Sequence, residues 1–66
     1  MNRLIRILLA EDHAVMRAAL RSLLEANKEI TVVGEADNGR HMMGLIESTA
    51  PDVVVMDINM PELNGI

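Results

Sequence analysis

Three short runs of mostly apolar residues constrain the fold of this chain more than any other feature of its sequence. They lie within Leu4–Ala10, Ile30–Ala36 and Asp52–Met56. A strand with one solvated face alternates polar and apolar residues, whereas a nearly continuous apolar strand is covered on both faces. We therefore expect three strands in a sheet that helices cover.

The two segments between these strands have the periodicity of amphipathic helices. The first helix is predicted over about His13–Asn27, and the second over about Arg40–Thr49. Their apolar residues are Val15, Met16, Ala19, Leu20, Leu23 and Leu24 in the first helix and Met42, Met43, Leu45 and Ile46 in the second. Gly44 costs about 1 kcal/mol relative to alanine, so the second helix should be the less stable. Pro51 should end it, because the residue before a proline resists the α conformation.

The strands and helices alternate along the chain, with short connections between them. Asp37-Asn38-Gly39 is a turn signal, and Gly34 marks a weak point or a bulge in the second strand. Apolar strands joined by helices imply a parallel sheet with right-handed crossovers. The sequence therefore predicts one α/β domain with the order βαβαβ. Ligands of such sheets bind beyond the carboxyl ends of the strands.

Size and charge exclude several classes of function. With 66 residues the chain can form only one small domain, which buries about 60% of its unfolded surface. It has no cysteine for a disulfide or a thiolate metal site, and no aromatic residue for its core. The net charge of −4 argues against direct binding to nucleic acid or to anionic lipid. The apolar opening is too short for an export signal or a membrane span, so we expect a soluble, cytoplasmic protein.

Carboxylates follow two of the predicted strands. Glu11 and Asp12 come directly after the first strand, and Asp57 comes directly after the third. If these strands are neighbours, the three side chains meet at one edge of the sheet. Each residue alone also has a structural interpretation. Asp12 could cap the following helix, Glu11 could be a solvated loop residue, and Asp57 could open a turn.

Together, the three carboxylates favour a cation site. Like charges a few ångströms apart repel one another unless a proton or a cation intervenes. A metal site that can be built from oxygen ligands alone, with no need for His or Cys, indicates Mg²⁺. Magnesium commonly joins a protein carboxylate to a phosphoryl group. The site therefore predicts phosphoryl chemistry on, or next to, an aspartate.

Three stretches of the chain carry a specific resemblance. They are ILLAEDHAVMRAALRSLL, GEADNGR and PDVVVMDINMPELNG. They resemble the first half of a bacterial two-component response-regulator receiver domain, of the NarL/FixJ type that joins a receiver to a helix-turn-helix output. The pattern DxxMPxxxG at Asp57–Gly65, combined with the upstream acidic pair, is highly specific. The resemblance spans essentially the whole chain.

This resemblance implies a truncated flavodoxin-like fold with the parallel strand order 2-1-3. Residues 1–66 would be a partial receiver domain that lacks the last two strands and ends at the start of the third helix. The family's Ser or Thr after strand four and its Lys after strand five would also be missing. Lys28 precedes strand two and cannot replace that lysine.

The resemblance also implies the role of each site residue. Asp57 would accept a phosphoryl group from a sensor histidine kinase, and the chain would have no enzymatic activity of its own. Asp12 would bind Mg²⁺ directly, Glu11 would bind it through a water, and the backbone carbonyl of Asn59 would be a further ligand. The family often has Asp where this chain has Glu11. His13 is expected to begin the helix rather than to bind the metal.

Two other functions remain possible from the sequence. One is a silent receiver fragment that dimerises without signalling, and the other is a Toprim-like, Mg²⁺-dependent nucleic-acid enzyme. The Toprim pattern requires Asp-x-Asp, and this chain has Asn59 at the third position. Without a fourth strand, Val53–Met56 would be an open edge that can pair with another chain. We therefore expect a homo-oligomer, either through antiparallel pairing of the third strands in the order 2-1-3-3-1-2 or through exchange of elements.

Overall fold

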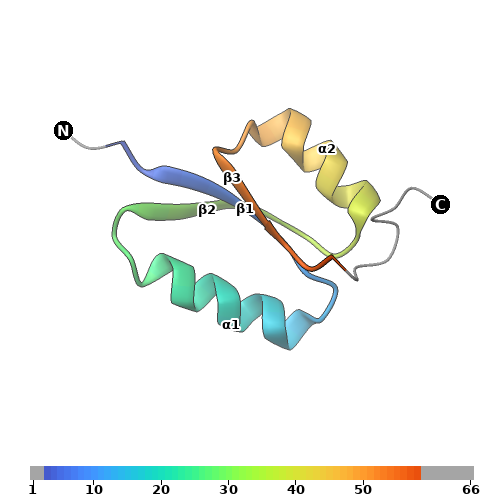
Figure 1. Cartoon of the computed structure of the whole chain (residues 1–66), viewed down its shortest axis with the longest axis horizontal. Helices are drawn as coiled ribbons and strands as arrows, with labels where there is room; N and C mark the ends of the chain where they lie inside the picture. The colour runs from blue at the N-terminus through green and yellow to red at the C-terminus, as the bar shows by residue number, and fades with distance from the viewer. Residues whose placement is uncertain (1–2, 59–66) are drawn as a thin grey trace.

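The computed structural model describes residues 3–58, which form a three-stranded sheet with a helix on either face (Figure 1). Its elements, in chain order, are β1 (Ile5–Ala10), α1 (Ala14–Glu25), β2 (Ile30–Ala36), α2 (Gly39–Thr49) and β3 (Val53–Met56). All strands are parallel, in the order β2-β1-β3. The predicted α/β class and strand order are confirmed. The predicted bounds match at half of the ends and differ by one or two residues at the others.

The core lies around β1, because this strand is paired on both sides and covered on both faces. Leu8 and Leu9 have no exposed surface, and they face opposite sides of the sheet. On the α2 side, Leu8 packs with Ala10, Ala36 and Met42. Complete burial of a leucine contributes about 1.5–3 kcal/mol. The aliphatic core that the composition predicted is therefore concentrated on one strand.

An extra residue interrupts the pairing of β2 with β1. Ile7 pairs with Val32, whereas Leu8 pairs with Gly34, so Val33 has no opposite residue in β1. A Cβ atom on Gly34 would lie 3.1 Å from Leu8 Cδ1, which explains the glycine. The predicted bulge in the second strand is confirmed. It also determines which side of the sheet the rest of β2 presents, because side chains alternate along a strand.

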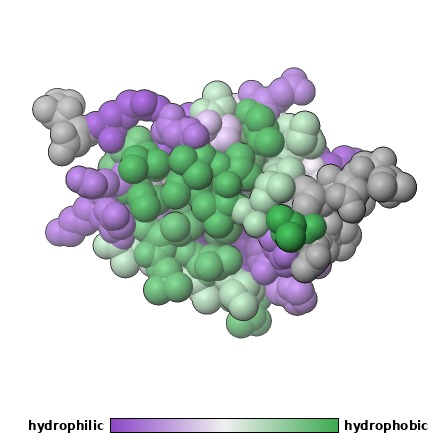
Figure 2. Space-filling view, in the orientation of Figure 1, coloured by the Kyte–Doolittle hydropathy of each residue, from purple (hydrophilic) through white to green (hydrophobic). Residues whose placement is uncertain are grey.

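The apolar residues of the helices are less buried than their periodicity predicted. Helix α1 contains no buried residue, and the exposed fractions of Val15 and Leu23 are 85% and 72%. In α2, Met42 is buried, but Met43 is 60% exposed, although the periodicity grouped both among the apolar residues of this helix. Figure 2 shows a large hydrophobic area over β3 and between the two helices.

The ends of α2 agree with the turn signals. The side chain of Asn38 accepts a hydrogen bond from the backbone N–H of His41 at 2.8 Å, which caps the first turn. The helix ends at Thr49, and the next residue, Ala50, has a left-handed conformation with a φ of 46°, directly before Pro51. Within residues 3–58, no helix has both the length and the apolar character needed to cross a membrane.

Candidate functional site

Two adjacent parallel strands deliver acidic residues to one edge of the sheet. Ala10 at the end of β1 is opposite Met56 at the end of β3. The next residues are Glu11 and Asp57, so their backbones are side by side. The backbone N–H of Asp57 donates to the carbonyl oxygen of Ala10 at 3.2 Å, which continues the ladder beyond β3. Strand pairing therefore fixes the position of Asp57 relative to Glu11.

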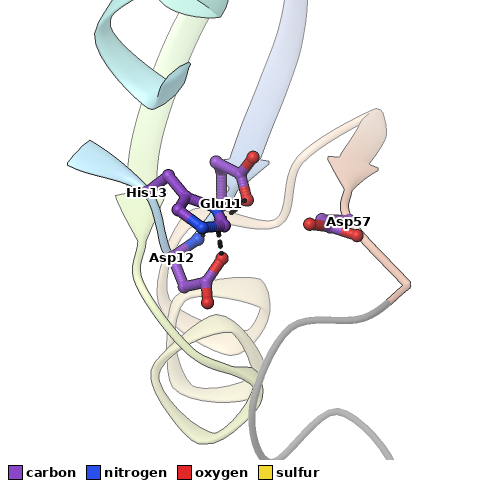
Figure 3. Close-up of side chains that lie close together, drawn as sticks. All are labelled: Glu11, Asp12, His13 and Asp57. Carbon is purple, nitrogen blue, oxygen red and sulfur yellow. Dashed lines mark hydrogen bonds and ion pairs between the residues drawn. The ribbon is translucent and has the colours of Figure 1, made fainter. Parts of the chain in front are cut away.

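Four side chains gather at this edge and form what we call the acidic centre: Glu11, Asp12, His13 and Asp57 (Figure 3). Each offers one ligand atom, and these atoms all lie within 4.8 Å of one another. The first three residues come from the end of β1 and the loop that follows it, and Asp57 faces them from the end of β3. The convergence that the sequence predicted for Glu11, Asp12 and Asp57 is present.

Glu11 is the most deeply buried member of the acidic centre. It is 6% exposed, although it is a charged residue outside the strands. Its backbone N–H donates to the carbonyl oxygen of Ala36 at 3.0 Å, and its Oε2 accepts from the backbone N–H of Asp12 at 3.0 Å. The alternative interpretation of Glu11 as a solvated loop residue is therefore wrong.

Asp12 does not cap α1. The residue at the N-cap position is His13, and its side chain makes no capping hydrogen bond. The Oδ1 atom of Asp12 is buried and accepts no hydrogen bond, although 27% of the whole side chain is exposed. A buried carboxylate oxygen without a donor is costly unless a cation is near it. The capping interpretation is therefore wrong, and the environment of Asp12 fits a metal ligand.

His13 begins the helix, as the sequence predicted, but its side chain also faces the acidic centre. Its Nδ1 lies 3.1 Å from Asp12 Oδ1 and 3.6 Å from Glu11 Oε2. The imidazole is well exposed, at 73%. The only sequence signal for this approach was that His13 directly follows the acidic pair.

Arg17 supports the acidic centre from α1, and sequence reasoning missed this role. Its Nη1 donates to the backbone carbonyl oxygen of Glu11 at 2.8 Å, and its Nε donates to Glu35 Oε1 at 3.2 Å. Arg21 also pairs with Glu35. The helical pattern placed Arg17 on the polar side of the helix, but nothing in the sequence indicated what lies opposite it.

Two other polar residues flank the third strand in the sequence, Asp52 before it and Asn59 after it. Asn59, which the resemblance implies as a ligand, lies outside the described residues. Asp52 lies at the opposite end of β3, where its Oδ2 accepts from the backbone N–H of Arg6 at 2.9 Å. This hydrogen bond, together with the guanidinium of Arg3, lowers the pKa of Asp52 below its usual value. Asp52 therefore has a structural role, whereas Asp57 faces the acidic centre.

Comparison with known proteins gives a consistent result. The family model described as "Response regulator receiver domain" matches residues 7–66. The Nitrate/nitrite response regulator protein NarL of Escherichia coli K12 is 45% identical over 60 residues, which is 91% of this chain and 28% of that protein. A protein-glutamate methylesterase/protein-glutamine glutaminase of Methanospirillum hungatei is 45% identical over 94% of this chain and 18% of its own length.

A solved structure has the same arrangement of strands and helices. It is the response regulator domain of Thermotoga maritima CheB, with a TM-score of 0.88 and 41% identity. The similarity covers 97% of this chain and 48% of that domain. The chain thus spans less than a third of the two relatives above and about half of this solved domain.

Proposed function

Because the chain belongs to the response regulator receiver domain family of two-component systems, we propose that it accepts a phosphoryl group on Asp57. The observation that carries this proposal is the position of Asp57 in the acidic centre, where its ligand atom lies within 4.8 Å of those of Glu11 and Asp12. A carboxylate held beside two others can act as a nucleophile once a cation reduces their mutual repulsion.

The residues of the acidic centre fit a divalent cation of the magnesium type. Asp12 supplies a buried oxygen without a hydrogen-bond donor, and Glu11 and Asp57 supply further carboxylates. Such oxygen ligands are those that Mg²⁺ prefers. We propose that Asp12 and Asp57 bind the ion directly, that Glu11 acts through a water, and that Asn59 contributes its backbone carbonyl. When bound, the ion would neutralise negative charge on the phosphoryl oxygens.

In the proposed reaction, a carboxylate oxygen of Asp57 attacks the phosphorus atom of a phosphohistidine. The new O–P bond forms an acyl phosphate, and the P–N bond of the donor breaks and leaves the imidazole. The chain contributes the nucleophile and its position, because strand pairing holds Asp57 beside Glu11. We propose a sensor histidine kinase in the cytoplasm as the donor. In the longer parent protein, a helix-turn-helix output that controls transcription would respond to the phosphorylation.

The experiment is phosphorylation of the protein by acetyl phosphate with Mg²⁺, followed by intact-protein mass spectrometry. We expect a phosphorylated species in the wild type and its loss in Asp57→Asn. Asp37→Asn is a matched control, because Asp37 is an exposed carboxylate just after β2. It should be phosphorylated like the wild type. Equal phosphate incorporation in Asp57→Asn and the wild type would contradict the assignment.

A second candidate function is supported by the exposed hydrophobic surface. β3 is an edge strand of the described sheet, and Val53 and Met56 are 45% and 40% exposed. A receiver segment with such an edge could associate with a second copy and remain silent in phosphoryl transfer. The two candidates differ in one measurable respect. The silent module would associate without incorporating phosphate, in the same acetyl phosphate experiment, whether or not Mg²⁺ is added.

A further inference from the structure

The imidazole of His13 places a nitrogen atom at the edge of an otherwise all-oxygen centre. Its Nδ1 lies 3.1 Å from Asp12 Oδ1 and 3.6 Å from Glu11 Oε2, and it belongs to the same group of atoms as Asp57. We propose that His13 is a direct ligand which shifts the preference of the acidic centre from Mg²⁺ toward a late first-row divalent transition metal ion. This inference rests on the metal site of the proposed function.

The distances suit two ligands of one ion. In an octahedral site with bonds of about 2.1 Å, adjacent ligand atoms lie about 3.0 Å apart. The Nδ1 atom of His13 and the Oδ1 atom of Asp12 have nearly this separation, at 3.1 Å. This same Oδ1 is buried and accepts no hydrogen bond, so the contact does not satisfy it. A cation placed between these two atoms would accept a lone pair from His13 Nδ1 and another from Asp12 Oδ1.

The local structure leaves the imidazole available to a metal. His13 is at the N-cap position of α1, but its side chain does not bond the first turn of the helix. It is 73% exposed, whereas the side chain of Glu11 is 8% exposed and therefore held in place. The acidic centre thus combines fixed oxygen ligands with one adjustable nitrogen ligand.

The chemistry of the ligand determines the kind of ion. Magnesium binds oxygen ligands and gains little from an imidazole, whereas Co²⁺, Ni²⁺ and Zn²⁺ bind imidazole strongly. If His13 acted only as a positive counter-charge beside the carboxylates, its removal would change the affinity for every divalent ion in the same direction. A ligand role predicts a change for the transition metal alone.

The test is calorimetric titration of the untagged protein with MgCl₂ and, separately, with CoCl₂ at one fixed pH. In His13→Ala, we expect the affinity for Co²⁺ to fall about tenfold or more, because even the loss of an outer partner of a ligand costs about 10–100-fold. The affinity for Mg²⁺ should stay within about twofold. The visible absorption of bound Co²⁺ should also change, because the ligand field around the ion loses the nitrogen donor of His13.

The matched control is His41→Ala, since His41 is another exposed histidine beside a carboxylate, with its Nδ1 3.5 Å from Asp37. It should leave both affinities unchanged. Equal Co²⁺ affinity in His13→Ala and the wild type, or a parallel change for both ions, would overturn the inference. Asp12→Asn separates the two proposals. If it leaves Mg²⁺ binding intact, the proposed metal site itself is wrong, whereas if Mg²⁺ binding is lost and only His13→Ala has no effect, the error is confined to His13.

Discussion

Arg17 joins three parts of the fold through one side chain. It donates from α1 to the backbone carbonyl oxygen of Glu11 after β1 and to the carboxylate of Glu35 in β2. Only 23% of the Arg17 side chain is exposed, so water competes weakly for these donors. The planar guanidinium can hold both acceptors at once, which a lysine could not do in the same geometry. Arg17 thus positions the loop that carries the acidic centre.

We expect Arg17→Met to weaken both the fold and the proposed metal site. Methionine keeps the apolar stem but leaves the carbonyl oxygen of Glu11 without its donor, which should lower the free energy of unfolding by about 1–2 kcal/mol. The affinity for Mg²⁺ should fall severalfold, because the loop is no longer held. Urea unfolding and a magnesium titration followed by NMR would measure these effects.

Arg21→Met is the matched control. Arg21 also pairs with Glu35, but it is 44% exposed, and its ion pairs are with Glu25 and Glu35 rather than with the loop of Glu11. Its loss should cost under about 1 kcal/mol, as for other exposed ion pairs, and should leave magnesium affinity unchanged. If both variants weaken Mg²⁺ binding equally, Arg17 has no specific role in positioning the loop.

The contrast between Arg17 and Asp57 shows what the sequence can predict at the residue scale. Asp57 was predictable because it directly follows an apolar strand, and adjacent parallel strands end at the same edge. The contacts of Arg17 depend on the bulge at Val33, which turns Glu35 toward α1. The sequence indicated a weak point or a bulge at Gly34, but it did not indicate which side of the sheet Glu35 would occupy.

At the scale of elements, Asp52 joins the start of β3 to β1. Its backbone N–H donates to the carbonyl oxygen of Arg6 at 2.8 Å, and its Oδ2 accepts from the Arg6 backbone N–H at 2.9 Å. The side chain of Arg6 also donates to the carbonyl oxygen of Ala50 at 2.8 Å. These bonds set the register of β3 at the end of the sheet farthest from the acidic centre.

This arrangement predicts a pH-dependent contribution to stability. The pKa of Asp52 is lowered in the folded state, chiefly by the hydrogen bond from Arg6, so its contribution is complete above the unfolded pKa of about 3.9. It is lost as the pH falls through the lower, folded pKa. We expect Asp52→Asn to be less stable than the wild type at pH near 7 and the difference to shrink below pH about 4.

Urea unfolding at several pH values would measure this difference. Glu47→Gln is the control, because Glu47 is exposed and its carboxylate has no hydrogen-bond or ion-pair partner in the described part of the chain. It should match the wild type at each pH. A gap between Asp52→Asn and the wild type that is constant from neutral to acid pH would contradict the electrostatic role of Asp52.

The elements themselves were predictable because their apolar residues have a clear period, but their burial was not. Helical periodicity grouped Val15, Leu23 and Leu24 as apolar residues of α1. Only Leu24 of these is half-buried, and Val15 and Leu23 remain largely exposed. A periodic pattern tells which residues share a face of the helix. It does not tell how much of that face the three described strands can cover.

At the scale of the whole molecule, the hydrophobic area over β3 predicts self-association (Figure 2). Exposed apolar residues on an unpaired strand edge favour pairing with a second copy, because both the backbone groups and the apolar surface gain partners. We expect the mass measured by sedimentation to rise with protein concentration. Antiparallel pairing of two β3 strands, in the order 2-1-3-3-1-2, remains our proposed arrangement.

Val53→Lys should weaken this association, since Val53 lies on β3 and is 45% exposed. Val54 is less suitable for the test, because it packs against the core and a charge there would destabilise the fold. The control is Val15→Lys, the same substitution on α1 at a residue that is 85% exposed. Association that is lost in Val15→Lys and kept in Val53→Lys would place the interface on α1 and contradict pairing through β3.

The bulge in β2 also limits how the length of this strand can change. Before Val33, even-numbered residues such as Val32 lie on the side of α1, and after it, even-numbered residues such as Ala36 lie on the side of α2. Deleting Val33 would place Gly34 directly after Val32, so the strand would alternate regularly and each remaining residue would keep its side of the sheet. Glu35 would still face α1, and Arg17 would keep its carboxylate. An extra residue inserted between Gly34 and Glu35 would instead turn Glu35 toward α2, so this strand accepts the loss of one residue at the bulge but not the gain of one beside it.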